Sequence, residues 1–201
     1  MIAILDWQHH GKPGRNDRGA SFDVNGDGEL EYETELTRGY IDAAAHVLES
    51  AGHHVYIFDD GTYRSRHARA NTIARAIAEP VAYLACHLNA GGGDYGMVLY
   101  DWRSGGGAQL ASELVKALSP RLAEVGRSRT MLSSPDQWGR AWSTIRGIYD
   151  GPAHISGACL EPAFMDTSKH HPLFTSEGLK RIGEAIAVGL MSWDLERRTA
   201  L

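Results

Sequence analysis

Short apolar runs alternate with amphipathic segments along the chain. Apolar stretches of strand length occupy residues 2–5, 55–58, 81–86, 97–100 and 155–160. Apolar positions at helical spacing predict a helix over 36–51, ended by Gly52, and further helices over about 64–77, 107–122 and 179–193. Strands alternating with helices predict an α/β fold with a mostly parallel, mixed central sheet and helices on both faces.

Two stretches lack this regular pattern. Residues 124–150 are polar, contain Trp138 and Trp142, and are expected to be irregular or to form a hairpin. Residues 196–201 are expected to be a frayed, disordered tail. The length of 201 residues fits one domain, so we predict a single domain over 1–201.

Composition and charge exclude several classes of protein. A net charge of −5, with scattered basic residues, argues against nucleic-acid binding. Cys86 and Cys159 lie in apolar runs and are predicted to be buried free thiols, too few for a disulfide scaffold or a thiolate zinc site. No stretch approaches the ~20 apolar residues of a membrane span. We see no export signal at the N-terminus and expect a protein made in the cytoplasm.

One loop has the spacing of a calcium site. Asp23, Asn25 and Asp27 offer oxygen ligands at alternate positions, and Gly28 is the sixth residue of the segment. The twelfth position, which should be a bidentate carboxylate, is Thr34. Calcium binding is therefore one hypothesis, and an Asx- and Gly-rich turn before a helix is the other.

Residues able to do chemistry follow three of the predicted strands. Asp6-Trp7-Gln8-His9-His10-Gly11 follows the first, His87 and then Asn89 follow the third, and Glu161 follows the last. Open α/β sheets bind ligands beyond the carboxyl ends of their strands, so these residues together predict a site. Two imidazoles with one carboxylate form a known catalytic zinc set that leaves a position open.

The helix that begins near residue 31 supplies the candidate carboxylate. Glu33 falls on the apolar face directed toward the sheet, whereas Glu35 belongs to a polar face. A carboxylate on a buried face is costly unless it is paired or bound to a metal, which favours Glu33 and leaves Glu35 as the alternative. Glu161 would then carry the proton, because the apolar residues directly before it, Ala158-Cys159-Leu160, should raise its pKa.

These segments resemble the zinc-dependent N-acetylmuramoyl-L-alanine amidases of the Amidase_3 type, found in bacterial autolysins and phage endolysins. The resemblance covers about residues 2–192. It rests on five segments. These are Ile4-Leu5-Asp6 before His9, Glu33 at the family's distance before Gly52, Arg66 with Ala70-Asn71, Cys86-His87-Leu88-Asn89-Ala90 before Gly96, and Leu160-Glu161-Pro162-Ala163-Phe164. Each segment is short, and their order and spacing carry the likeness.

The resemblance implies a peptidoglycan hydrolase. It implies that His9, Glu33 and His87 bind one zinc ion, that Glu161 is the general acid/base, and that the substrate is the amide between N-acetylmuramic acid and L-alanine of the stem peptide. The chain departs from the family where Gln8 and His10 replace the glycines flanking the first histidine and where Trp7 replaces a proline. His10 thus remains an alternative to His9 as ligand.

Two rival functions remain at this point. One is a zinc peptidase or deacylase of the same fold, because a fold does not decide the substrate. The other is a catalytically inactive wall-binding module, against which the retention of all four chemical positions argues. A substrate groove is expected near Trp7, Tyr95, Trp102 and Trp138, where aromatic rings suit sugar or peptide stacking; core packing explains them equally well. If the protein is the amidase, we expect it to act on the bacterial cell wall during lysis, either as a phage or prophage lysin or as a chain taken from a larger protein.

Overall fold

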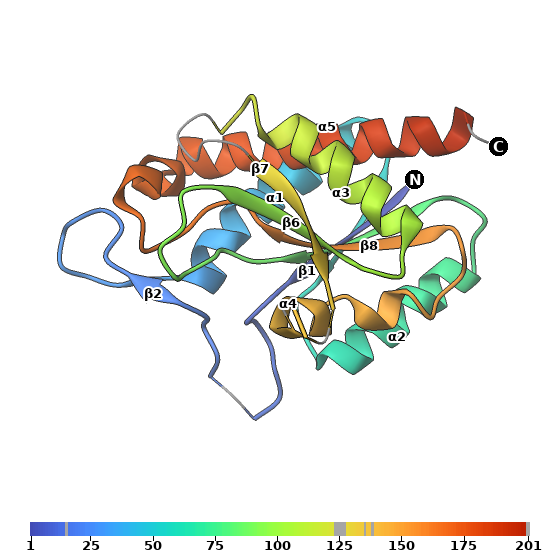
Figure 1. Ribbon diagram of the computed structural model, residues 1–201, viewed down its shortest axis with the longest axis horizontal. Coiled ribbons are helices and arrows are strands. Elements are labelled where there is room, and N and C mark those ends of the chain that lie inside the picture. Colours follow the sequence, from blue (N-terminus) through green and yellow to red (C-terminus); the bar gives the residue numbers. More distant parts are fainter. Residues whose placement is uncertain (15, 123–127, 135, 138, 200–201) are drawn as a thin grey trace.

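The computed structural model describes residues 1–14, 16–122, 128–134, 136–137 and 139–199, and Figure 1 gives the arrangement of the elements. At its centre is a six-stranded sheet in the order β4-β1-β5-β8-β6-β7. The strands are β1 (Ile2–Trp7), β4 (His54–Phe58), β5 (Val81–Cys86), β6 (Gly96–Asp101), β7 (Ser128–Ser133) and β8 (Ile155–Glu161). Five of them coincide with the apolar runs, so those predictions are confirmed.

The sheet is mixed and mostly parallel, as predicted. Strands β4, β1, β5 and β8 run parallel to one another, β6 is antiparallel to β8, and β7 is parallel to β6. The carboxyl ends of β1, β5 and β8 therefore meet at one edge of the sheet. That edge is where the candidate residues were expected.

Helices cover both faces of the sheet. The long helices are α1 (Glu33–Ser50), α2 (Tyr63–Arg75), α3 (Gly105–Leu118) and α5 (Ser176–Thr199), with the shorter α4 (Gly139–Ser143), η2 (Arg146–Ile148) and η3 (Ser168–Phe174). Helices α1, α3 and α5 pack their apolar sides into one buried cluster, whereas α2 and η2 contribute to a second cluster on the opposite face (Figure 1). The expected α/β architecture is thus confirmed.

The polar stretch 124–150 differs from expectation. It holds an edge strand, β7, followed by α4 and η2, instead of a hairpin. A parallel partner for β6 requires a crossover, which α3 provides. An edge strand has a single neighbour, and its sequence, SRTMLS, therefore carries little of the continuous apolar signal of an inner strand.

The C-terminal segment is also more regular than expected. Helix α5 continues to Thr199, so residues 196–199 are helical, while residues 200–201 lie outside the described part of the chain. Arg198 Nε donates to Asp194 Oδ2 at 2.9 Å, and Arg197 Nη2 donates to the carbonyl of Ala153 at 3.2 Å. These contacts of the last turn explain why the helix does not end at 195.

The acidic loop joins two short strands that precede α1. Strands β2 (Ser21–Phe22) and β3 (Glu31–Tyr32) form an antiparallel pair. Within the loop, Asp23 accepts hydrogen bonds from the amides of Gly26 and Gly28, and Asn25 Oδ1 accepts one from the amide of Asp27. The side chains stabilise the turn through their own backbone, in the manner of Asx turns. Calcium binding here stays a prediction.

Cys86 and Cys159 are buried free thiols, as predicted. Among the described helices, none combines the length and hydrophobicity that crossing a bilayer requires.

Candidate metal centre and active site

A cleft of about 1110 Å³ opens at the carboxyl edge of the sheet. All four residues singled out in the sequence line it: His9, Glu33, His87 and Glu161. His9 lies two residues beyond β1, His87 directly follows β5, and Glu161 is the last residue of β8. Because β5 pairs with both β1 and β8, strand register brings His87 and Glu161 close together and starts the His9 turn beside them.

His9, Glu33 and His87 form a cluster that could hold a metal ion. Each offers a ligand atom, and these atoms all lie within 4.8 Å of one another. Glu33 Oε1 lies 2.8 Å from His87 Nδ1 and 3.4 Å from His9 Nε2, so the carboxylate sits between the two imidazoles. No other group of three histidine, cysteine or acidic side chains in the described residues is close enough for this.

Glu33 is the first residue of α1 and is buried. Its Oε2 accepts a hydrogen bond from the amide of Ala20 at 3.0 Å, and its Oε1 accepts one from the amide of Leu88 at 3.2 Å. Burial alone would raise the pKa of Glu33, but hydrogen bonds and charge from His87 and His9 outweigh it and hold the pKa well below its usual range. The carboxylate is therefore ionised and pre-positioned.

Glycine is required next to this carboxylate. Gly19 has φ of +75°, and a Cβ there would lie 2.4 Å from Glu33 Oε2. The alternative ligand, Glu35, is exposed and forms an ion pair with Arg18. The helical periodicity thus separated the buried glutamate from the solvated one correctly.

His87 has a firmly held backbone and a free ring nitrogen. Its amide donates to the carbonyl of Leu160 at 3.0 Å, and its own carbonyl accepts from the buried Tyr40 hydroxyl at 2.9 Å. Nε2 is buried without a hydrogen-bond partner among the described residues. A buried polar atom without a partner is costly. The other ring nitrogen, Nδ1, is the one that faces Glu33.

His9 adopts a left-handed backbone conformation, with φ of +58°. Its Nδ1 lies 2.8 Å from Asp17 Oδ1, while Lys12 Nζ donates to the other oxygen of Asp17 at 3.0 Å. Burial lowers the pKa of His9, but hydrogen bonding and charge from Glu33, with the hydrogen bond to Asp17, outweigh it and leave that pKa raised. Sequence reasoning missed Asp17, because nothing in the polar 12–20 segment distinguishes it until the loop folds back.

The neighbouring His10 takes no part in the cluster. Its ring stacks on Trp7 with centroids 3.7 Å apart and planes 4° from parallel. Its Nδ1 lies 2.8 Å from the carbonyl oxygen of Asp59. Of the two adjacent histidines, the structure therefore brings only His9 to Glu33 and His87.

Glu161 provides a second kind of carboxyl group in the same cleft. Its Oε2 is buried and has no hydrogen-bond partner among the described residues. Burial raises the pKa of Glu161 well above its usual range, and the charge of Glu33 raises it further. Two glutamates with oppositely shifted pKa values suit two different tasks, one as an anionic ligand and one as a group that exchanges protons.

The predicted aromatic groove is wrong for the residues that can be placed. Trp7 stacks on His10, Tyr95 packs edge-on against Phe164, and Trp102 is exposed; none of them is among the described residues that line the cleft. Trp138 lies outside the described part of the chain. Tyr63, at the start of α2, lines the cleft instead, together with Lys12 and Pro13. Trp7 and Tyr95 pack against neighbouring rings, which sequence could not distinguish from substrate contact.

The sequence matches no protein-family model and no curated protein. Solved structures do match: the CwlD amidase from Clostridioides difficile, in complex with the GerS lipoprotein, has a TM-score of 0.68 at 18% identity and covers 96% of this chain and 97% of that one. N-acetylmuramoyl-L-alanine amidase AmiC2 of Nostoc punctiforme has a TM-score of 0.69 at 17% identity, covering 96% of each chain. The chain has the N-acetylmuramoyl-L-alanine amidase fold.

In another matching structure, the same fold forms only part of a longer chain. Cwp6 from Clostridium difficile matches with a TM-score of 0.72 at 21% identity over 95% of this chain, which spans only 29% of the length of Cwp6. At such identities the likeness concerns the fold. The chemistry rests on this chain's own residues.

Proposed function

We propose that the protein is a zinc-dependent peptidoglycan hydrolase that cleaves the amide between N-acetylmuramic acid and L-alanine of the stem peptide. The observation that carries this proposal is the His9–Glu33–His87 cluster beside buried Glu161, in one cleft of an amidase fold. The resemblance implied these same residues as ligands and proton carrier, which supports the proposal.

The three side chains fit zinc. Two imidazoles and a carboxylate are a ligand set that zinc takes in hydrolases, with a position left for water or substrate. The ionised Glu33 carboxylate, with Oε1 2.8 Å from His87 Nδ1 and 3.4 Å from His9 Nε2, favours a cation bound between the three side chains. Asp17 engages Nδ1 of His9, which orients the ring so that Nε2 faces Glu33. His9, Glu33 and His87 would thus hold one zinc ion.

The catalytic role falls to Glu161. Zinc bound by the three ligands supplies a Lewis acid for the amide carbonyl and for the attacking water. As the water oxygen bonds to the amide carbon, Glu161 would take the proton that water loses, and it would give this proton to the nitrogen of L-alanine as the amide C–N bond breaks. Its raised pKa suits this exchange, because the protonated form is accessible nearer to neutral pH than for an ordinary glutamate.

Digestion of purified peptidoglycan tests the proposal. The expected result is release of new alanine amino termini without new reducing sugar ends, loss of this release on zinc chelation, and its return when zinc is added back. New amino termini from other residues would favour the peptidase reading. Wall binding without any release, by a protein shown to hold zinc, would favour the inactive module.

Two finer predictions accompany this function. Calcium at Asp23, Asn25 and Asp27 would add stability to the loop, which thermal unfolding with and without calcium would detect at fixed ionic strength. Action in bacterial lysis, as a phage or prophage lysin, would appear as loss of turbidity when the protein is added to exposed cell walls.

A further inference from the structure

We propose that Arg66 is a positioning residue that holds the His9 turn in its metal-binding conformation. The inference rests on the proposed metal site and is independent of the substrate. Arg66 does not line the cleft and contacts neither Glu33 nor His87 through a side chain. It would act on the metal through the backbone on both sides of His9.

The His9 turn needs external support. In the described chain, His9 is the only residue other than glycine with a positive φ. Such a conformation costs free energy for a side chain with a Cβ, and it persists where surrounding contacts impose it. If the turn relaxed, the ring would leave the position from which it faces Glu33.

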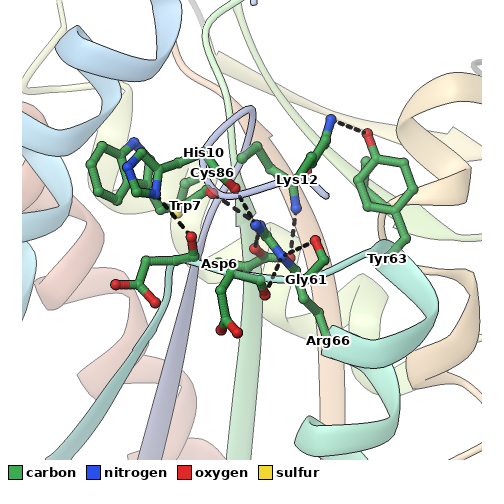
Figure 2. A network of polar contacts seen from close by, with 12 residues as sticks. Asp6, Trp7, His10, Lys12, Gly61, Tyr63, Arg66 and Cys86 are labelled. Atoms are coloured by element: carbon green, nitrogen blue, oxygen red, sulfur yellow. Dashed lines mark hydrogen bonds and ion pairs between the residues drawn. The ribbon is translucent and has the colours of Figure 1, made fainter. Parts of the chain in front are cut away.

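Arg66 supplies those contacts from the first turns of α2. Its Nη1 donates to the carbonyl of Trp7 at 2.9 Å, and its Nη2 donates to the carbonyl of His10 at 2.5 Å. These two carbonyls bracket the Gln8–His9 segment. Figure 2 shows the guanidinium lying beneath the turn, with its donors directed at both. One planar group thus sets the distance between the start and the end of the turn.

The same side chain connects the turn to a second loop. Arg66 Nε donates to the carbonyls of Asp60 and Gly61, each at 3.1 Å, and Gly61 in turn donates its amide to the carbonyl of Gly11 at 3.1 Å. Gly11 has φ of +62°, and a Cβ there would lie 2.0 Å from the carbonyl oxygen of Asp59. The two loops are therefore in direct contact, with the guanidinium spanning both.

Asp6 makes the buried cation tolerable. Both side chains are fully buried, and Arg66 Nη1 forms an ion pair with Asp6 Oδ1. Tyr83 and Gln8 donate to the other oxygen of Asp6. If Arg66 only balanced the charge of Asp6, any cation at this position would serve. Donating to the four backbone carbonyls of the two loops requires the planar guanidinium. A lysine at position 66 would keep the charge but not these hydrogen bonds, and it therefore distinguishes the two roles.

The test compares Arg66→Lys with Asn71→Ala, a matched control on the same helix. Asn71 is also buried, but it donates to the carbonyl of Gly147, away from the His9 turn. Zinc affinity is measured by competition with a chromophoric chelator, and the cobalt-substituted proteins are compared by their visible absorption. We expect Arg66→Lys to weaken zinc binding about 10–100-fold, as for other residues that orient metal ligands, and to change the cobalt spectrum. Asn71→Ala should change neither, even where it lowers thermal stability.

Gly11→Ala provides an independent variant in case Arg66→Lys does not fold. It keeps the buried ion pair but pushes the two loops apart, and it should weaken zinc binding in the same direction. Wild-type zinc affinity and an unchanged cobalt spectrum in either folded variant would overturn the proposed role of Arg66. Absence of zinc binding by the wild-type protein would instead overturn the metal site itself.

Discussion

The two histidines of the cluster are supported in different ways. His87 directly follows β5, an inner strand paired on both sides, and its backbone is fixed by Leu160 and Tyr40. His9 stands in a left-handed turn beyond β1 and depends on Asp17 for its ring orientation. Their side chains are 9% and 19% exposed, respectively. Sheet register thus places one ligand, and charged contacts between loops place the other.

This difference has a practical consequence. Support by register is shared among many backbone hydrogen bonds and apolar contacts, so a single polar substitution should barely move His87. Support by loops is concentrated in a few charged side chains, so removing one of them should lower the affinity for the metal. The proposed site is therefore expected to fail first on the His9 side.

The largest effect is expected at Glu33, which both histidines contact. Glu33→Gln removes the anionic ligand, and zinc affinity should fall by more than the ~10–100-fold typical of residues that only orient ligands. Metal content after dialysis measures this, with Glu35→Gln as the matched control from the exposed face. Equal zinc content in the two variants would contradict the assignment of Glu33.

The next largest effect concerns Glu161. Glu161→Gln should lower amide hydrolysis about 10²–10⁴-fold, the usual contribution of a general acid/base, while zinc content stays unchanged. Turnover and metal content are measured on the same preparation. Unaltered hydrolysis would remove Glu161 from the mechanism, and loss of zinc would show that it supports the metal site instead.

Asp17→Asn and Tyr40→Phe compare the two supports directly. Asp17→Asn should weaken zinc binding about 10–100-fold, because His9 loses a charged partner for its ring. Tyr40→Phe removes a hydrogen bond to the backbone of His87 and should cost about 0.5–1.5 kcal/mol of stability, with little change in zinc affinity. Chelator competition and thermal unfolding measure both variants. Equal losses of zinc affinity would show that the two histidines do not differ in support.

The smallest effect is a pH dependence of the metal-free protein. Burial raises the pKa of Glu161 in the folded state above 4.5, so the folded protein binds more protons than the unfolded chain above that pH. Stability should therefore fall as pH rises from about 4.5 to the raised pKa and then stay level. Glu161→Gln should lose this slope and be more stable near neutral pH, as denaturant unfolding at several pH values would show. An unchanged slope would mean that Glu161 is not the group responsible.

Much of the site could be predicted from sequence because it depends on strand ends. His87 and Glu161 follow continuous apolar runs, and helical periodicity placed Glu33 on the buried side of α1. The same runs predicted five strands of the sheet. The edge strand β7 was missed, because its polar sequence lacks that signal.

The amino-acid sequence by itself determined the alternation of strands and helices, the edge of the sheet where chemistry gathers, and the candidate ligands. Only the tertiary structure decided between His9 and His10, added Asp17, connected Arg66 to the His9 turn, and placed Tyr63 in the cleft where Trp7 and Trp102 had been expected. The physical reason is the range of the interactions. Hydrophobic periodicity is local and can be read along the chain, whereas the loops are held by hydrogen bonds and ion pairs such as Asp6–Arg66, whose partners are brought together only by folding.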